Sequence, residues 1–440
     1  MSPQSRRHND ALRALIREAR WTNHNFAAAV NRVAAEAGLT FHYDRTAVSH
    51  WLSGSRPRPP VPTLVAEAMS RRLGRHIAVA ETGMTDSPVV GTALVEETSG
   101  VQGLRQLVLA DLDPVRRTLL REQPFRADWA VAPEWSSART VRLADLSPIE
   151  RGAWAAVEAM TSAFAAAGEA FGGGHARLAL AAYLATDVTP RLQLSRTEPP
   201  PPVSLSATAG LTRLLGFMCF DSLYHHLAQR YYRVALHLMS EAGDAVGQAA
   251  VLGSMSSQAR FLGRHRQMIL LADTAVARAG SSTPPGTRAA LLGQAAVAHA
   301  TLSERDKALV QLTEAERHLD ETGVDVTGSK AEHAHRAGQV LALLGDHHGA
   351  ERAWRESLRQ SPGTQRRSRI LTTHQLAELH FQQGRLELAC ETWQGFLDEY
   401  PYIRSARVDF TFQKFRRQLE SHAENASVRR VLKQADQLGV

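Results

Sequence analysis

Residues 331–362 read AEHAHRAGQVLALLGDHHGAERAWRESLRQSP, and this stretch decides the fold. Two segments rich in alanine, leucine and arginine flank the pair Gly345–Asp346, which is typical of a turn between helices. Ala350 is small enough to let the two helices approach closely, and Trp354, one turn later, fills the groove toward a neighbouring pair. Pro362 ends the second segment because it cannot continue a helix. The stretch therefore predicts a helical hairpin.

The same pattern recurs every 39 to 42 residues over residues 205–440. Each unit has a small or apolar anchor residue, and in three units a glycine lies five residues before it. The anchors are Ala228, Met268, Ala308, Ala350 and Ala389, and the glycines are Gly263, Gly345 and Gly384. This spacing predicts a stacked solenoid of helical hairpins as the C-terminal repeat domain.

These units resemble tetratricopeptide repeats. The positions in residues 331–362 that match the family are Ala334, Ala337, Gly338, Leu341, Gly345, Asp346, Ala350, Trp354 and Pro362. The units are longer than the family repeat, so longer helices or loops are expected. The resemblance implies that the first helix of each hairpin lines a concave groove. By the family's register, the groove residues are Arg213, Phe217, Phe220, Ser257, Arg260, His335, Gln339, His374, Glu378 and Phe381.

This predicted groove mixes aromatic, arginine and hydrogen-bonding side chains, which suits an extended peptide. Two alternatives remain open at this stage. The groove is closed by the helices expected over residues 148–190, or it forms a contact between two copies of the chain.

A second motif lies near the N-terminus, where residues 44–59 read DRTAVSHWLSGSRPRP. Asp44 is a typical N-cap for a short helix, and Gly54 ends this helix. Helical spacing divides this segment into two faces. The apolar face carries Ala47, Val48, Trp51 and Leu52, and the polar face carries Arg45, Thr46, Ser49 and His50.

The motif resembles the recognition helix and following turn of XRE-type (phage-repressor) helix-turn-helix proteins. The resemblance covers residues 9–75 and implies that the polar face reads bases in a DNA major groove. Arg56 and Arg58, on a stiff proline-rich connector, are placed to contact phosphates. One departure is that about eleven more residues than usual in the family separate Phe26 from Asp44. The preceding helix is therefore longer than usual, or the turn is expanded.

The whole chain divides by composition into four predicted parts. Residues 1–84 form the helix-turn-helix domain, with further helices over 9–20, from Thr22 to Gly38, and over 62–73. Residues 85–147 form a partly structured linker with a helix near 112–122, residues 148–204 a helical connecting region, and residues 205–440 the repeats. In the connecting region, helices over 148–168 and 175–187 flank the triplet Gly172–Gly174, and Pro190 ends the second. The triplet favours a flexible turn over an anion-binding loop.

Positive charge is concentrated in the N-terminal domain. Residues 1–84 hold 12 arginines and 6 acidic residues, so about a fifth of the chain carries +6 of the total charge of +7. This asymmetry favours a polyanionic partner. The two cysteines and the absence of an apolar leader predict a cytoplasmic protein, and no apolar run predicts a membrane span. Known catalytic motifs are absent and the histidine pairs lack suitable neighbours, so no enzyme activity, metal or cofactor is expected.

Three further segments extend the resemblance, namely FGGGHAR at 171–177, AAYL at 181–184 and AQRYY at 228–232. Together with the two motifs, they resemble actinobacterial regulators that join this helix-turn-helix to tetratricopeptide repeats. Negative regulators of differentiation and antibiotic production are among them. The resemblance implies an all-α transcription regulator that binds double-stranded DNA as a homodimer. Its repeats would sense a peptide, small molecule or protein, or supply the dimer contact. The alternative is a tetratricopeptide scaffold or adaptor whose N-terminal domain binds protein.

Overall fold

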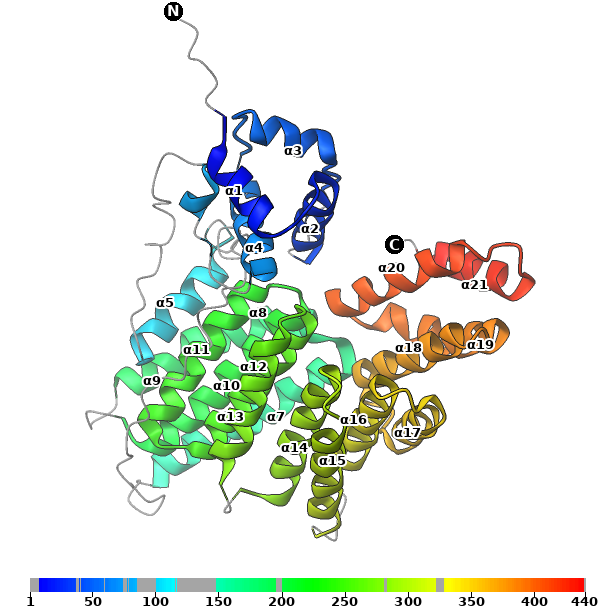
Figure 1. Cartoon of the computed structure of the whole chain (residues 1–440). Helices are drawn as coiled ribbons and strands as arrows, with labels where there is room; N and C mark the ends of the chain where they lie inside the picture. Colours follow the sequence, from blue (N-terminus) through cyan, green and yellow to red (C-terminus); the bar gives the residue numbers. More distant parts are fainter. Residues whose placement is uncertain are drawn as a thin grey trace, which may run out of the picture.

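The computed structural model describes residues 8–36, 39, 41–58, 60–73, 77, 79–84, 100–114, 116, 148–194, 200–280, 283–321 and 328–438 (Figure 1). All regular secondary structure within these ranges is helical. The all-helical prediction is therefore confirmed.

The N-terminal unit consists of α1 (Asp10–Glu18), α2 (Asn23–Glu36), α3 (Arg45–Leu52), α4 (Val61–Leu73) and the short 3-10 helix η1 (Val79–Thr82). Asp44 caps α3 as predicted, by accepting hydrogen bonds from its first turn, and Asn9 caps α1 in the same way. Leu12, Phe26 and Trp51 meet in one core, and the contacts of this core are separate from those of the repeats. The unit is thus built around its own hydrophobic centre.

The helices that precede the repeats pack against the first hairpin. They are α5 (Gly100–Leu112), α7 (Pro148–Phe171), α8 (Gly173–Tyr183), the π-helical turn η5 (Leu184–Val188) and α9 (Thr189–Gln193). The predicted end at Pro190 is wrong, because this proline lies in the first turn of α9, where its missing N–H has no partner to lose. Most of the helix predicted near 112–122 lies outside the described residues.

Five helical hairpins follow, as the repeat pattern predicted. They are α10 (Pro202–Asp221) with α11 (His225–Ala242), α12 (Ala245–Phe261) with α13 (His265–Ala279), α14 (Pro285–Thr301) with α15 (Arg305–Asp320), α16 (Ser329–Leu343) with α17 (His347–Gln360), and α18 (Arg366–Gln382) with α19 (Leu386–Glu399). Figure 1 shows them in a curved row from green to orange. Each of the five anchors lies in the second helix of its hairpin and is 0% exposed. The anchors are therefore the points of closest helix packing.

The turn inside every hairpin contains a residue in the left-handed region, five positions before the anchor. Gly263, Gly345 and Gly384 occupy it in three hairpins, with φ between 69° and 84°. Leu223 and Ser303 occupy the same position in the other two, with φ of 61° and 62°. A residue with a side chain is strained there by roughly 1–2 kcal/mol. The five units thus share one backbone turn even where the glycine signal is missing from the sequence.

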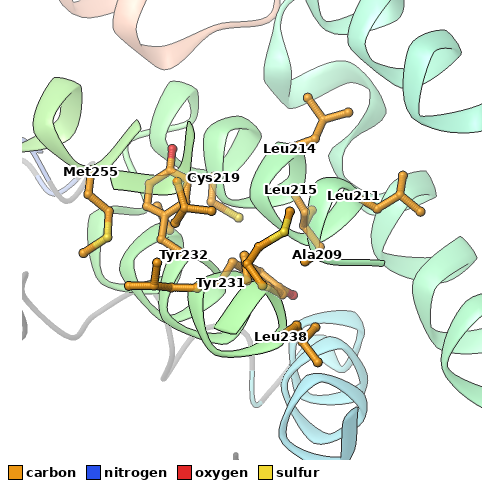
Figure 2. Close-up of a cluster of buried hydrophobic side chains, with 14 of the residues drawn as sticks. Ala209, Leu211, Leu214, Leu215, Cys219, Tyr231, Tyr232, Leu238 and Met255 are labelled. Atoms are coloured by element: carbon orange, nitrogen blue, oxygen red, sulfur yellow. The ribbon is translucent and has the colours of Figure 1, made fainter. Parts of the chain in front are cut away.

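Apolar side chains of the α10–α11 hairpin form a buried cluster, which Met255 of α12 joins (Figure 2). Tyr231 of α11 reaches α5, where its hydroxyl donates to Asp111 Oδ2 at 3.0 Å, and Leu238 lies on the same side. Among the described helices, α10 alone is long and apolar enough to cross a membrane. Its apolar window is 67% buried in the protein, so packing against its neighbours accounts for its composition.

The repeat row is closed on itself by the helices before and after it. The last hairpin is followed by η6 (Tyr400–Tyr402), α20 (Ala406–Glu420) and α21 (Ala426–Gln437). The N–H of Arg404 donates to the carbonyl of Phe171 at 2.7 Å, and the N–H of Gly174 donates to the carbonyl of Arg404 at 3.0 Å. A Cβ atom on Gly172 would lie 2.4 Å from that Arg404 carbonyl oxygen. The prediction of a flexible turn is therefore wrong, because the triplet packs closely against the backbone of Arg404.

A carboxylate of the chain itself, that of Asp221, occupies the N-terminus of α8. The N–H of Gly173 donates to Asp221 Oδ2 at 2.9 Å, and Arg367 Nε donates to Asp221 Oδ1 at 2.7 Å. Arg367 Nη1 also lies 3.1 Å from Glu169 Oε1 of α7. This network joins α7, α8, α10 and α18, and it holds the first and last hairpins together.

Candidate nucleic-acid interface and ligand cavity

Helix α3 presents a polar surface supported by an apolar one. Val48 and Trp51 are buried and Ala47 and Leu52 half-buried in the core of the N-terminal unit. Arg45, Thr46, Ser49 and His50 are all exposed. We call these four the α3 polar face. Their exposure leaves their side chains available to a partner, while the other face fixes the helix.

The buried side of α3 is held by aromatic contacts. The ring of Trp51 meets Phe26 of α2 edge-on at 6.2 Å and Tyr43 at 5.0 Å between centroids. Asp44 caps the helix by accepting from the N–H groups of Thr46 and Ala47 at 2.9 and 3.0 Å. The hydrogen bond from the Ala47 N–H, supported by those from Thr46, lowers the pKa of Asp44 and outweighs the slight desolvation of its carboxylate.

The extra residues before α3 are accommodated both in the helix and in the connection. α2 runs for 14 residues to Glu36, and α3 starts at Arg45. Asn31 of α2 holds the connection by two hydrogen bonds to the backbone of Tyr43: its Nδ2 donates to the carbonyl at 2.8 Å, and its Oδ1 accepts from the N–H at 2.9 Å. Sequence reasoning missed this residue, although an asparagine inside an amphipathic helix was a signal.

Arg56 and Arg58 follow α3 and are both exposed. Asn9 at the start of α1 donates its N–H to the carbonyl of Leu52 at 3.0 Å, which fixes the end of α3 against α1. Figure 1 shows α3 on the side of the N-terminal unit that faces away from the repeats, whereas α4 lies next to them. The α3 polar face is thus not covered by the chain's own repeats.

A buried ion pair attaches the N-terminal unit to the repeats. Glu67 of α4, 4% exposed, contacts Arg71 Nε at 2.8 Å and also pairs with Arg264 in the turn between α12 and α13. Leu262 and Gly263 of that turn border a hollow against α2 and α4. Among the described residues, this hairpin turn is therefore one place where the N-terminal unit is attached to the repeats.

The concave side of the repeats contains a cavity of about 670 Å³. Its walls come from the first helices of the hairpins and from α17, and its remaining sides from α7 and α20. The lining includes Glu169, Phe217, Phe220, Ser257, Arg260, Phe261, Gln294, Glu332, His335, Arg336, Gln339, Arg367, Thr372 and Arg407. Six of the ten predicted groove residues are brought together here, namely Phe217, Phe220, Ser257, Arg260, His335 and Gln339.

The polar wall of the cavity is a neutral hydrogen-bonded chain. Burial, together with nearby arginines, lowers the pKa of His335 to about 3, so its ring is uncharged at neutral pH. Gln339 Nε2 lies 2.9 Å from His335 Nε2 and donates to it, so His335 Nδ1 donates to Thr372 Oγ1 at 2.7 Å. This wall offers hydrogen bonds without charge.

The other four predicted groove residues lie outside the cavity lining. Arg213 is partly buried beside it, with Nη1 3.4 Å from Ser254 Oγ. The C-terminal helices cover the remaining three, for which the prediction of an open groove is wrong. Glu378 Oε2 lies 3.0 Å from His374 Nε2 and Oε1 lies 2.8 Å from Lys414 Nζ of α20, and the ring of Phe381 packs edge-on against Phe415.

Residues that sequence reasoning missed complete the cavity. Arg367 and Arg407 enter it from α18 and α20, and Phe261 enters it from the end of α12. Their places depend on the closure of the row by α7 and α20, for which the repeat register carries no signal.

A comparison with known families gives one match, confined to the N-terminal unit. The model described as the SP15 N-terminal domain matches residues 12–85. This range starts inside α1 and ends just after η1, so it coincides with the unit that the core defines. No curated protein matches the chain. Residues 12–85 are therefore similar to that domain.

Proposed function

We propose that this protein is a DNA-binding transcription regulator whose helical repeats sense a ligand or supply a dimer contact. The observation that carries the proposal is the α3 polar face, four exposed polar side chains on a helix whose other side is locked into a core. A major groove accepts a helix of this kind, with arginine directed at guanine and serine, threonine or histidine at mixed edges. The N-terminal unit is then a helix-turn-helix with α3 as its recognition helix.

Charge supports the same proposal. The N-terminal 84 residues carry almost all of the chain's net positive charge. The exposed pair Arg56 and Arg58 extends the α3 polar face along the connector toward α4. Neutralising phosphates releases counterions, and this supplies most of the sequence-independent affinity of such proteins.

The direct test is a gel shift with the full chain and genomic fragments, including the region upstream of its own gene. We expect a retarded complex that competitor DNA of unrelated sequence displaces poorly. One small domain usually needs two half-sites for useful affinity, so a bound homodimer is expected. Retardation of every fragment alike, at any salt concentration, would contradict sequence-specific regulation.

Replacing Arg45 or His50 with alanine is expected to weaken binding to the specific fragment by about 1–3 kcal/mol each. Both side chains are exposed, so the melting temperature should stay at the wild-type value. Arg430→Ala, at an exposed arginine of α21, is the matched control and should bind as wild type. If both α3 variants bind the specific fragment as wild type does, α3 is not the recognition helix.

Removing Arg56 and Arg58 together is expected to reduce affinity for all sequences alike. Two lost phosphate contacts should flatten the dependence of log K on log salt by about two units of slope. Titration at several salt concentrations measures this slope. An unchanged slope with an altered base preference would instead place these arginines on base edges.

The second candidate is a repeat-based adaptor whose N-terminal unit binds protein. It shares the helical hairpins but needs a different α3 surface, because protein interfaces bury an apolar centre. The four exposed positions on α3 are all polar, which favours DNA. The proposal of a DNA-binding regulator also includes the resemblance to actinobacterial regulators and a cytoplasmic location.

A further inference from the structure

Four arginines and two glutamates line the cavity on the concave side of the repeats, and only some of these charges compensate one another. Arg336 Nη2 lies 2.5 Å from Glu332 Oε1. Arg367 is paired with Asp221 and Glu169, as described above. Both glutamates of the lining therefore already have an arginine partner.

The other two arginines, Arg260 and Arg407, have no carboxylate at hydrogen-bond distance among the described residues. Nε of Arg407 is shielded from solvent and has no hydrogen-bond partner there. Its guanidinium lies over the rings of Phe220 and Phe261, at 4.3 and 5.4 Å from their centroids. A buried donor without an acceptor is costly, so an acceptor atom of a ligand placed against this Nε would be stabilising.

The cavity raises the cost of these charges further. Burial, followed by the charge of Arg367, lowers the pKa of Arg407 to about 10. Burial, followed by the charge of Arg336, lowers the pKa of Arg260. Both guanidiniums remain protonated at neutral pH, so the cavity keeps a positive charge that a bound anion would relieve.

We infer that this cavity binds a small organic anion, with its charged group on Arg260 and Arg407 and an apolar body against Phe217, Phe220 and Phe261. The volume of about 670 Å³ is that of a site for a small molecule. Glu169 of α7 and Arg407 of α20 also line this cavity, so it is bounded on more sides than an open peptide groove along the first helices of the hairpins. The inference names the ligand class of the proposed sensor, and it rests on that proposal only for its effect on DNA.

The site is directly connected to the turn that attaches the N-terminal unit. Arg260 and Phe261 are the last residues of α12, and Arg264, three residues later, pairs with the buried Glu67 of α4. Phe261 also borders the hollow between that turn and the N-terminal unit. A ligand that draws Arg260 and Arg407 together therefore acts on the turn that carries the DNA-binding unit.

Binding is tested on the full chain with 4-phenylbutyrate and phenyl phosphate as anionic probes and 4-phenylbutanamide as the neutral match. We expect the anions, at millimolar concentration, to raise the melting temperature and to give a calorimetric isotherm, and the amide to do neither. The stronger of the two anions assigns a carboxylate or a phosphate to the natural ligand. Equal binding of the amide, or no binding of either anion at 10 mM (about the weakest affinity worth calling a site), would overturn the inference.

Arg260→Gln and Arg407→Gln are each expected to lower the affinity for the anionic probes about tenfold or more. Arg352→Gln, at an exposed arginine of α17 outside the cavity, should bind as wild type. Without ligand, Arg260→Gln should melt no lower than wild type, because it removes a charge that repels Arg336. A purely structural arginine would give the opposite result, and wild-type affinity in both cavity variants would exclude this site.

The two proposals fail in different ways. If the probes bind in the cavity and the gel shift is unchanged, the ligand site stands and its coupling to DNA does not. If the probes fail to bind while the specific gel shift persists, the DNA-binding function stands and the ligand class is wrong.

Discussion

Replacing Asp221 with alanine is expected to destabilise the protein by about 3–5 kcal/mol, because it removes the fully buried partner of Arg367 and leaves this guanidinium only the more exposed Glu169. Asp221 is 0% exposed and accepts from Arg367 and from the N–H of Gly173. The same variant removes the ion pair between the first hairpin and the last. Urea denaturation followed by circular dichroism measures the loss.

The pH dependence of this effect has a defined sign. Burial alone would raise the pKa of Asp221, but the Arg367 and Arg407 charges and its hydrogen bonds outweigh burial and hold the pKa below the ordinary value of 3.8. Its stabilisation is therefore complete above about pH 4 and is lost as the pH falls through the lowered pKa. The variant should lack this component of acid sensitivity.

Asp187→Ala is the matched control for Asp221→Ala. Asp187 also pairs with an arginine, Arg191 at 2.8 Å, but the two side chains are 35% and 48% exposed. Removing an exposed pair is expected to cost under about 1 kcal/mol. Equal small losses in the two variants would show that Asp221 does not hold the ends of the repeat row together.

Replacing Trp51 with alanine is expected to cost the N-terminal unit about 3–5 kcal/mol and to unfold it within an otherwise folded chain. The indole is 4% exposed and lies between Phe26 and Tyr43, so its loss leaves a cavity at the centre of a small core. The core of the repeats makes separate contacts. Hydrogen exchange should therefore rise in α1 to α4 while α10 to α19 keep their protection.

Trp51→Phe keeps an aromatic ring in the same place and should retain most of the protection. This control separates loss of packing from loss of the indole itself. Wild-type exchange rates in α3 of the alanine variant would mean that the apolar and polar faces of the helix have been assigned wrongly.

The local parts of this structure could be predicted because each depends on a few neighbouring residues. The two faces of α3 follow from the helical period and from the cap at Asp44. The hairpins follow from the spacing of small anchors such as Ala228 and Ala389, all of which proved fully buried. Ser303 shows the limit, because its left-handed turn has no glycine to announce it.

The closure of the repeat row could not be predicted, because it depends on pairs far apart in the chain. Gly172 and Arg404 meet only after five hairpins have stacked with the observed curvature, and no periodicity links them. The same closure removed His374, Glu378 and Phe381 from the expected groove. It also brought Arg407 into the cavity, which changed the expected ligand from an extended peptide to a small anion.

The seat of Arg404 on the glycine triplet also decides how the repeat domain yields to force or heat. In a repeat domain whose hairpins contact only their neighbours, single hairpins can unfold one at a time. Here the backbone bonds of Phe171 and Gly174 to Arg404 tie the two ends of the row together. One hairpin therefore cannot separate from its neighbour without straining the hydrogen bonds to Arg404. We therefore expect the hairpins of this domain to unfold together, in one cooperative melting step.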